Sequence, residues 1–474
     1  MNSYYQMLAE GKRKSSGQVR NSTLILLGFA TAFFPRLLVS MGAPSVINFA
    51  HFGIVPIVFL IAILTTKTRD RKRTRLVWQM LTGIFILLIC MLISALINGS
   101  GVVNIALQFM FQSEPFMFVA AIVAVPMGGE KLKKFQYWLL GFASFNWLLA
   151  IAQSILLPLG IYPKPEGGTL EDNIGGVFGG GGGSAANYIA CTVSIYFGLY
   201  FFNQFKELSI WLRVLPLIGG VYQTQVSDSK QVFLALAVGW GLLAVTKVKR
   251  PVRLIMYTTV GLIAILTFRW ALLNSDAAFL SPYQNWINRP IWGWDGLAAE
   301  TKFAGFQIIP SYYKSPLNWL FGLGPGHTVS RLGGWVFRDY ADLLLPLGAT
   351  VHPATAAVWE VVDTSYLPNE STVYFPLFTW MGLWGDLGVV GIGAYLYLGF
   401  IIWQKVCIDD FCRFLLLSTA SFGWILTQME EPGHMLTVAC LLALQWQAAR
   451  EKQLIQRAQA PDKSLLVSSK LIRT

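Results

Sequence analysis

Hydrophobic runs and short polar breaks alternate along most of this chain. About 20 apolar residues form a helix that crosses the hydrocarbon core of a membrane while satisfying its own backbone, so we divided the chain on that length. Twelve runs result, near 22–41, 52–66, 77–97, 104–127, 137–160, 185–204, 208–226, 231–246, 254–273, 386–404, 413–429 and 434–449. The second, eleventh and twelfth are short enough to be tilted or partly re-entrant. The pattern predicts an all-α polytopic membrane protein of about twelve transmembrane helices.

Composition agrees with this class. The chain is 54% hydrophobic and 13% charged, whereas charged residues make up about a quarter of a soluble domain. Its net charge of +12 does not indicate a nucleic-acid partner, because the basic residues form small clusters between apolar runs, as in cytoplasmic loops of membrane proteins. The five cysteines lack metal-ligand spacing apart from an isolated Cys407 and Cys412 pair, so we expect neither a metal site nor a cofactor.

The basic residues also predict which way the chain faces. Of the 36 Lys and Arg residues, 27 lie in alternate breaks and in the two terminal segments, and such clusters remain in the cytoplasm. Both termini are therefore expected to be cytoplasmic. The predicted organisation is a cytoplasmic tail (1–21), spans one to nine (22–273), a large extracytoplasmic loop (274–385), spans ten to twelve (386–449) and a second cytoplasmic tail (450–474).

The loop at 274–385 is the largest stretch without a membrane-length apolar run. Within it, 302–313 has helical spacing, Gly322–Gly326 forms a glycine-rich turn, and 373–384 predicts a short half-buried helix that leads into the tenth span. Long loops are translocated whatever their charge, so the basic residues here do not contradict the predicted sidedness. They are Arg289, Lys302, Lys314, Arg331 and Arg338.

Charged residues inside or beside predicted spans allow two interpretations each. Arg36 and Glu114 either pair with each other or with the backbone, or belong to a transport relay. We favour pairing, because a relay needs more ionisable groups at mid-depth. Lys230 either pairs with Asp228 at the membrane boundary or contacts a ligand. The glycine run 179–183 precedes a predicted helix and suits a phosphate site or a plain connector, and we favour the connector because the P-loop ending is absent.

Several short motifs occur in a familiar order and membrane placement. Ser229-Lys230 opens a predicted span, and Lys302 lies fourteen residues before Pro316-Leu317. The further motifs are Gly175-Gly176-Val177-Phe178, Phe321-Gly322-Leu323-Gly324 and Gly388-Val389-Val390-Gly391. From about residue 170 to 405 the chain resembles the O-antigen ligase and O-antigen polymerase superfamily of bacterial membrane glycosyltransferases. The likeness rests on the order of these motifs, since each alone is short.

The resemblance implies metal-independent transfer of a glycan from an undecaprenyl-pyrophosphate carrier, on the outer face of the bacterial cytoplasmic membrane. The implied partners are the lipid-linked donor, a glycan or lipid acceptor and other polysaccharide assembly proteins. A pyrophosphate leaving group needs cations at the outer boundary. Lys230 and Lys302 stand where the family has arginines, and lysine lacks the bidentate fork of arginine. The candidate substitutes are Arg289, Arg331 and Arg338.

The resemblance does not supply a base for the acceptor hydroxyl. The family's His-Asn pair, about eleven residues before Gly388, is replaced by Leu377-Phe378. The candidate bases are Glu370, His352 and His327, because each can take a proton from a hydroxyl. Two alternatives to a glycosyltransferase stay open: a solute or inorganic-ion transporter, and a catalytically silent member of an envelope polysaccharide assembly complex.

Overall fold

The computed structural model describes residues 20–66, 68, 70–162, 169–179, 186–248, 251–275, 284 and 296–459, without the side chains of 251, 253, 254, 257, 264, 268, 369, 370 and 457–459. Across these residues the protein is all-helical and contains no strand. Each of the twelve apolar runs contains a helix. These helices are α2 (Asn21–Phe33) with α3 (Pro35–Ser40), α4 (Ala50–Thr65), α5 (Arg71–Asn98), α6 (Val102–Ala124), α7 (Gly129–Leu156), α8 (Ala186–Gln204), α9 (Ile210–Val226), α10 (Lys230–Lys247), α11 (Pro251–Asn274), α19 (Thr379–Ile401), α20 (Asp410–Phe422) and α21 (Pro432–Gln459).

Six helical segments in the described part of the chain are long and apolar enough to cross a membrane. They are Ser45–Thr65, Arg71–Asn98, Val102–Ala124, Gly129–Leu156, Lys230–Lys247 and Thr372–Val406. Their outward faces keep large apolar side chains exposed, such as Leu96 at 85% and Trp240 at 70%. Water disfavours such surfaces and lipid accepts them. The helices therefore indicate a membrane protein, while the number of twelve spans stays a prediction.

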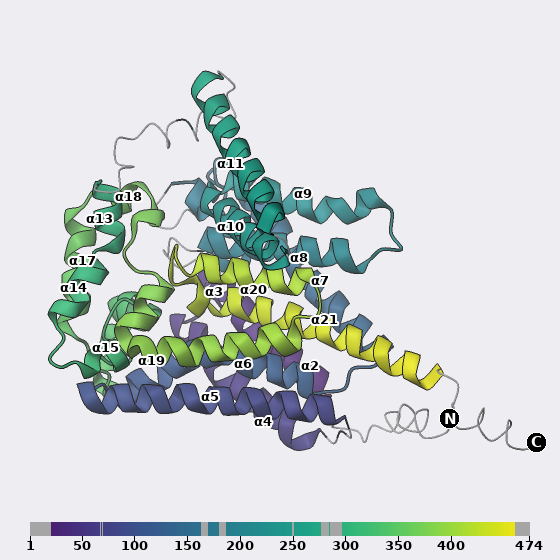
Figure 1. Cartoon of the computed structure of the whole chain (residues 1–474), viewed down its shortest axis with the longest axis horizontal. Helices are drawn as coiled ribbons and strands as arrows, with labels where there is room; N and C mark the ends of the chain where they lie inside the picture. Colours follow the sequence, from purple (N-terminus) through teal and green to yellow (C-terminus); the bar gives the residue numbers. More distant parts are fainter. Residues whose placement is uncertain are drawn as a thin grey trace, which may run out of the picture.

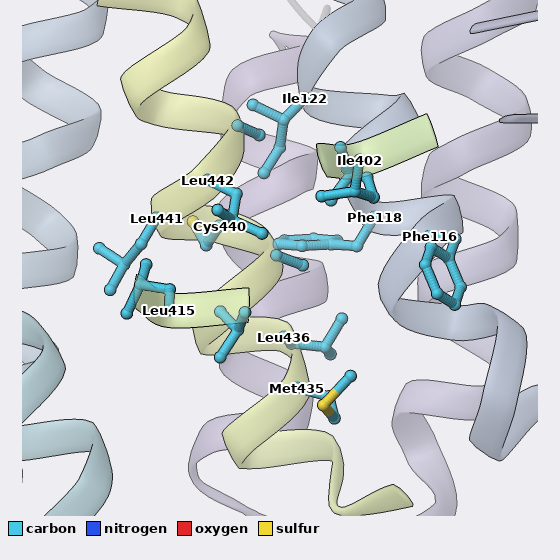
Figure 2. Close-up of a cluster of buried hydrophobic side chains, with 14 of the residues drawn as sticks. Phe116, Phe118, Ile122, Ile402, Leu415, Met435, Leu436, Cys440, Leu441 and Leu442 are labelled. Atoms are coloured by element: carbon cyan, nitrogen blue, oxygen red, sulfur yellow. The ribbon is translucent and has the colours of Figure 1, made fainter. Parts of the chain in front are cut away.

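The core lies where α6, α8 and α21 meet. These helices are buried on nearly every side over much of their length, which is expected of helices that are apolar all round and surrounded by others. Figure 2 shows part of this core, with Phe118 of α6 pointing toward α21, which carries Leu436 and Cys440, and with Leu415 of α20 beside it. The other helices surround this centre and leave their outer faces exposed.

Two of the predicted spans are not single helices. The run 22–41 breaks between Phe33 and Pro35, because proline lacks the backbone N–H that a continuing helix needs. The run 413–429 is helical only to Phe422, after which the chain reaches a 3₁₀ turn, η10 (Thr427–Glu430). These breaks place Arg36 and Glu431 at helix ends, where their side chains meet.

The predicted loop folds into short helices that gather at one end of the long helices, opposite the end of α21 (Figure 1). They are α13 (Leu297–Phe303), α14 (Gly305–Ser311), α15 (Leu317–Phe321), α16 (Phe337–Leu344), α17 (Pro353–Thr364) and α18 (Leu367–Glu370). They are joined to the first turn of α6, where Asn104 Nδ2 donates to Thr350 O at 2.8 Å. Elsewhere, Arg450 forms two hydrogen bonds of 2.8 Å to Asp70, joining two segments predicted to be cytoplasmic. Segments predicted to share a side thus contact one another, and the sidedness itself stays a prediction.

Hydrogen bonds to Asp386 hold the glycine-rich turn Gly322–Gly326 against α19. The buried Asp386 carboxylate accepts from Gly326 N at 2.9 Å and Thr328 N at 2.8 Å. Gly388 has φ 63° and interrupts α19, so a short helix from Thr379 leads into the longer one, close to the predicted 373–384. A Cβ on Gly388 would lie 2.4 Å from the carbonyl carbon of Leu320. This interlock fixes the chain just before Arg331.

We expect Gly388→Ala to destabilise the protein by about 2 kcal/mol or more, because the new methyl group meets backbone and the positive φ strains any other residue. Thermal unfolding of the purified full-length chain in detergent measures this effect. The matched control is Gly393→Ala in the same helix, where nothing lies within 4 Å of the added Cβ. An unchanged unfolding midpoint for Gly388→Ala would contradict the interlock.

Candidate functional site

A cavity of about 610 Å³ lies where five separate segments converge. They are the α2–α3 break, the start of α4, the 3₁₀ turn η4 (Gly176–Phe178), the π-helix η6 (Arg331–Val336) and the junction of η10 with α21. Its lining includes Arg36, His51, Phe178, Arg331 and Glu431. No group of three or more His, Cys, Asp or Glu residues that could hold a metal ion occurs among the described residues.

The charge in the cavity centres on Glu431. Arg36 Nη2 lies 2.8 and 2.9 Å from its two carboxylate oxygens, and Arg331 Nη1 also donates to it. Burial alone would raise the pKa of Glu431, but Arg331 and Arg36 outweigh it and hold that pKa below the usual value. One carboxylate serves two guanidinium groups. These three side chains together therefore carry one positive charge, while the other charged residues of the lining are Arg338 with its partner Asp339, and Asp172.

Backbone geometry fixes the two arginines. Arg36 follows the break at Pro35, and one guanidinium nitrogen lies 3.5 Å from Phe178 O. Arg331 opens η6, and its backbone N–H donates to Glu430 at 2.7 Å. Glu430 also accepts from Gln108 at 3.0 Å, and burial raises the pKa of Glu430 to about 7. The neighbouring carboxylates thus differ, because Glu431 compensates charge while Glu430 positions the backbone of Arg331.

Arg36 and Glu114 do not pair with each other, so that alternative from the sequence is wrong. Glu114 instead contacts His51, whose Nδ1 lies 2.8 Å from both carboxylate oxygens. His51 and Glu114 are both buried, on α4 and α6. His51 was not among the predicted site residues, because a single histidine in an apolar run forms no pattern. The available signal was Glu114 itself, since a buried carboxylate requires a partner.

The two lysines predicted to bind pyrophosphate lie elsewhere. Lys230 forms an ion pair of 2.5 Å with Asp228. Lys302 donates to Phe375 O at 2.8 Å and Ile425 O at 2.7 Å, and burial lowers the pKa of Lys302 to about 7. Neither lysine lines the cavity. Arg289 lies outside the described residues. Their predicted role in binding pyrophosphate stays a prediction.

Two of the predicted bases lie together. The rings of His327 and His352 stack with centroids 5.5 Å apart. His327 uses both ring nitrogens, toward Leu323 O at 2.9 Å and Thr350 Oγ1 at 2.8 Å, and burial lowers its pKa. His352 caps α17, and burial lowers its pKa to about 4. These contacts are structural, and neither histidine lines the cavity.

The third predicted base is Glu370, whose side chain lies outside the described residues. Its backbone ends α18, next to the segment that leads into α19. The catalytic role predicted for Glu370, His352 and His327 stays a prediction. Three of the basic residues singled out in the sequence do line the cavity. They are Arg36, Arg331 and Arg338.

We expect Glu431→Gln to lower the stability of the protein by about 3–5 kcal/mol, because it removes the carboxylate that compensates two largely buried guanidinium groups. The matched control is Asp339→Asn, which breaks the exposed pair of Arg338 and Asp339 and should change stability by about 1 kcal/mol or less. Thermal unfolding in detergent compares the two variants. Equal midpoints would show that Glu431 does not hold the cluster together.

No family model matches this chain, and none of the curated proteins matches it. The resemblance to the O-antigen ligases and polymerases therefore rests on the motifs within the sequence. The geometry of the cavity is an independent basis for its function, because it depends on contacts between residues that are distant in the chain.

Proposed function

We propose that this protein is a membrane glycosyltransferase that binds the pyrophosphate of a polyprenyl-linked glycan in the cavity, at Arg36 and Arg331. The observation that carries the proposal is the pair of guanidinium groups sharing the single carboxylate of Glu431. The reaction is transfer of the glycan to a hydroxyl acceptor, as in the ligase or polymerase type. Its place is the outer face of the bacterial cytoplasmic membrane.

The cavity favours an anion of the phosphate type. Guanidinium groups bind phosphate oxygens through forked, charge-assisted hydrogen bonds. The Nε atom of Arg331 is buried with no partner among the described residues, and an unpaired buried donor is costly unless a ligand completes it. Arg338, which also lines the cavity, adds a partly exposed guanidinium. These donors suit a pyrophosphate better than a neutral solute.

The position of the cavity agrees with a lipid-linked donor. Every segment that converges on it belongs to a stretch that the distribution of basic residues assigns to the outer side or to an outer helix end. A polyprenyl chain can then stay in the membrane while its headgroup reaches the cavity. One motif of the resemblance is also there, since Phe178 lines the cavity and its carbonyl accepts from Arg36.

In this proposal Arg36 and Arg331 bind the pyrophosphate, in place of Lys230 and Lys302. Lys302 is engaged by two backbone carbonyls, and this contact joins α13 to the segments around α19 and α20. We therefore assign Lys302 to holding the loop in place. Arg36 and Arg331 take the anion-binding role, and they restore the forked donor geometry that lysine lacks.

We expect Arg36→Gln and Arg331→Gln each to weaken binding of undecaprenyl pyrophosphate by about 10- to 100-fold, the loss expected for a hydrogen bond to a charged group. Binding is measured with the purified full-length protein in nanodiscs. Arg71→Gln, an exposed arginine at the start of α5, is the charge-matched control and should bind normally. Undecaprenol, which lacks the phosphates, should bind far more weakly than the pyrophosphate.

Arg331→Gln removes part of the Glu431 cluster, so Arg338→Gln serves as the second variant. It lines the cavity from an exposed position and should reduce affinity without loss of folding. Normal binding in all three folded variants, or equal binding of undecaprenol, would overturn the proposal. Loss of solute uptake with surface glycan unaffected in an Arg36→Gln strain would favour the transporter.

A further inference from the structure

A histidine and a glutamate form a buried dyad at the cavity wall. His51, at the start of α4, lines the cavity. Its Nδ1 lies 2.8 Å from each carboxylate oxygen of Glu114, in the middle of α6. Phe52 packs edge-on against the imidazole with ring centroids 4.2 Å apart. The ring is therefore held in one orientation from two sides.

The dyad leaves one ring nitrogen for a ligand. An ionised carboxylate can only accept hydrogen bonds, so Nδ1 is the nitrogen that carries the proton. Nε2 has no partner among the described residues and belongs to a residue that lines the cavity. A neutral imidazole in this tautomer presents its lone pair at Nε2. This is the arrangement in which a carboxylate orients a histidine that acts as a base.

A second unpaired atom lies close in the chain. The Oδ1 atom of Asn48 is buried without a partner among the described residues, and Asn48 also lines the cavity. Asn48 precedes His51 by three residues, so the two share one side of the turn that opens α4. Both atoms are acceptors, and one hydroxyl group donates to only one of them, so two hydroxyl groups of a sugar would complete both.

We propose that His51 is the general base of the transfer reaction and that Glu114 is its positioning residue. This inference rests on the proposed function. The acceptor hydroxyl gives its proton to His51 Nε2 as its oxygen forms a bond to the anomeric carbon of the donor sugar. The bond from that carbon to the phosphate oxygen breaks, and its electron pair leaves with the polyprenyl pyrophosphate. Arg36 and Arg331 stabilise this leaving group, and Glu114 stabilises the imidazolium.

The other three histidines are placed less well for this role. His327 has both ring nitrogens engaged, and His352 uses Nδ1 to cap α17. The fourth histidine, His434, is fully buried and hydrogen-bonded to Gln428 at 3.1 Å. Among the four histidines, His51 alone lines the cavity that contains the arginine cluster. Proton acceptor and anion site therefore share one space.

The test compares donor binding with glycan transfer. The probe is the lipid-linked glycan extracted from a strain of the host bacterium in which the gene is deleted, where the unused donor should accumulate. With the full-length protein in nanodiscs, we expect His51→Gln to reduce transfer by about 100- to 10,000-fold, the usual contribution of a general base. Binding of undecaprenyl pyrophosphate should stay within about threefold of wild type. Added imidazole should restore part of the transfer lost in His51→Ala.

Glu114→Gln should reduce transfer by at least about 10-fold and by up to about 10,000-fold, the loss seen when a carboxylate that orients a histidine base becomes an amide, again with normal donor binding. A purely structural role is tested by the double variant His51→Gln with Glu114→Gln, which keeps an amide hydrogen bond between α4 and α6. The matched control is Tyr196→Phe, which removes a buried bond of 2.7 Å to Ser418 between α8 and α20, away from the cavity. It should transfer normally.

The outcomes separate the two proposals. Near-wild-type transfer by the folded His51→Gln variant, or by the double variant, would overturn the role of the dyad while leaving the transferase intact. The same conclusion follows if imidazole fails to restore any activity to a folded His51→Ala protein that still binds donor. If no lipid-linked glycan accumulates in the deletion strain and the wild-type protein transfers none, the proposed function itself fails, and the base falls with it.

Discussion

The carboxylate of Glu431 between Arg36 and Arg331 is the interaction on which the rest of this structure depends. Charges in a membrane protein are costly unless they are compensated or face a polar space. In this cluster the arginines are paired with Glu431, and all three side chains line the cavity. It connects the break after α2, the π-helix of the large loop and the start of α21. Because one carboxylate meets two guanidinium groups, the same contact that holds these segments also leaves a cation available to a ligand.

The fold around this cluster is arranged to keep it in place. The glycine-rich turn and α19 interlock through Asp386, and the chain then continues directly to Arg331. On the opposite wall, the turn at Phe178 accepts from Arg36, and its preceding N–H groups donate to Asn146 and Gln153 of α7. The motifs that carry the resemblance to the O-antigen ligases and polymerases thus act in part as structural junctions around the cavity. Catalysis in our account comes from other residues.

The helices could be predicted because long apolar runs leave the backbone few alternatives, and the break at Pro35 is visible for the same kind of reason. The site could be predicted only in part. Arg36 and Arg331 stood out as charged residues, but their pairing with Glu431 joins positions 395 and 100 residues apart and depends on the packing. The partners of Lys302 are backbone carbonyls. Every residue has one, so the residue types in the sequence do not indicate which carbonyls it contacts. His51 was missed because its candidate role depends on its contact with Glu114, which lies on another helix.

The central claim is that the pyrophosphate of a polyprenyl donor binds at Arg36 and Arg331. A cryo-electron microscopy map of the full-length protein in nanodiscs with undecaprenyl pyrophosphate tests it most directly. Our account predicts density for the two phosphates against these guanidinium groups, with the polyprenyl chain leading from the cavity into the lipid. Phosphate density at Lys230 and Lys302, with the arginine cluster unchanged and its cavity empty, would contradict it.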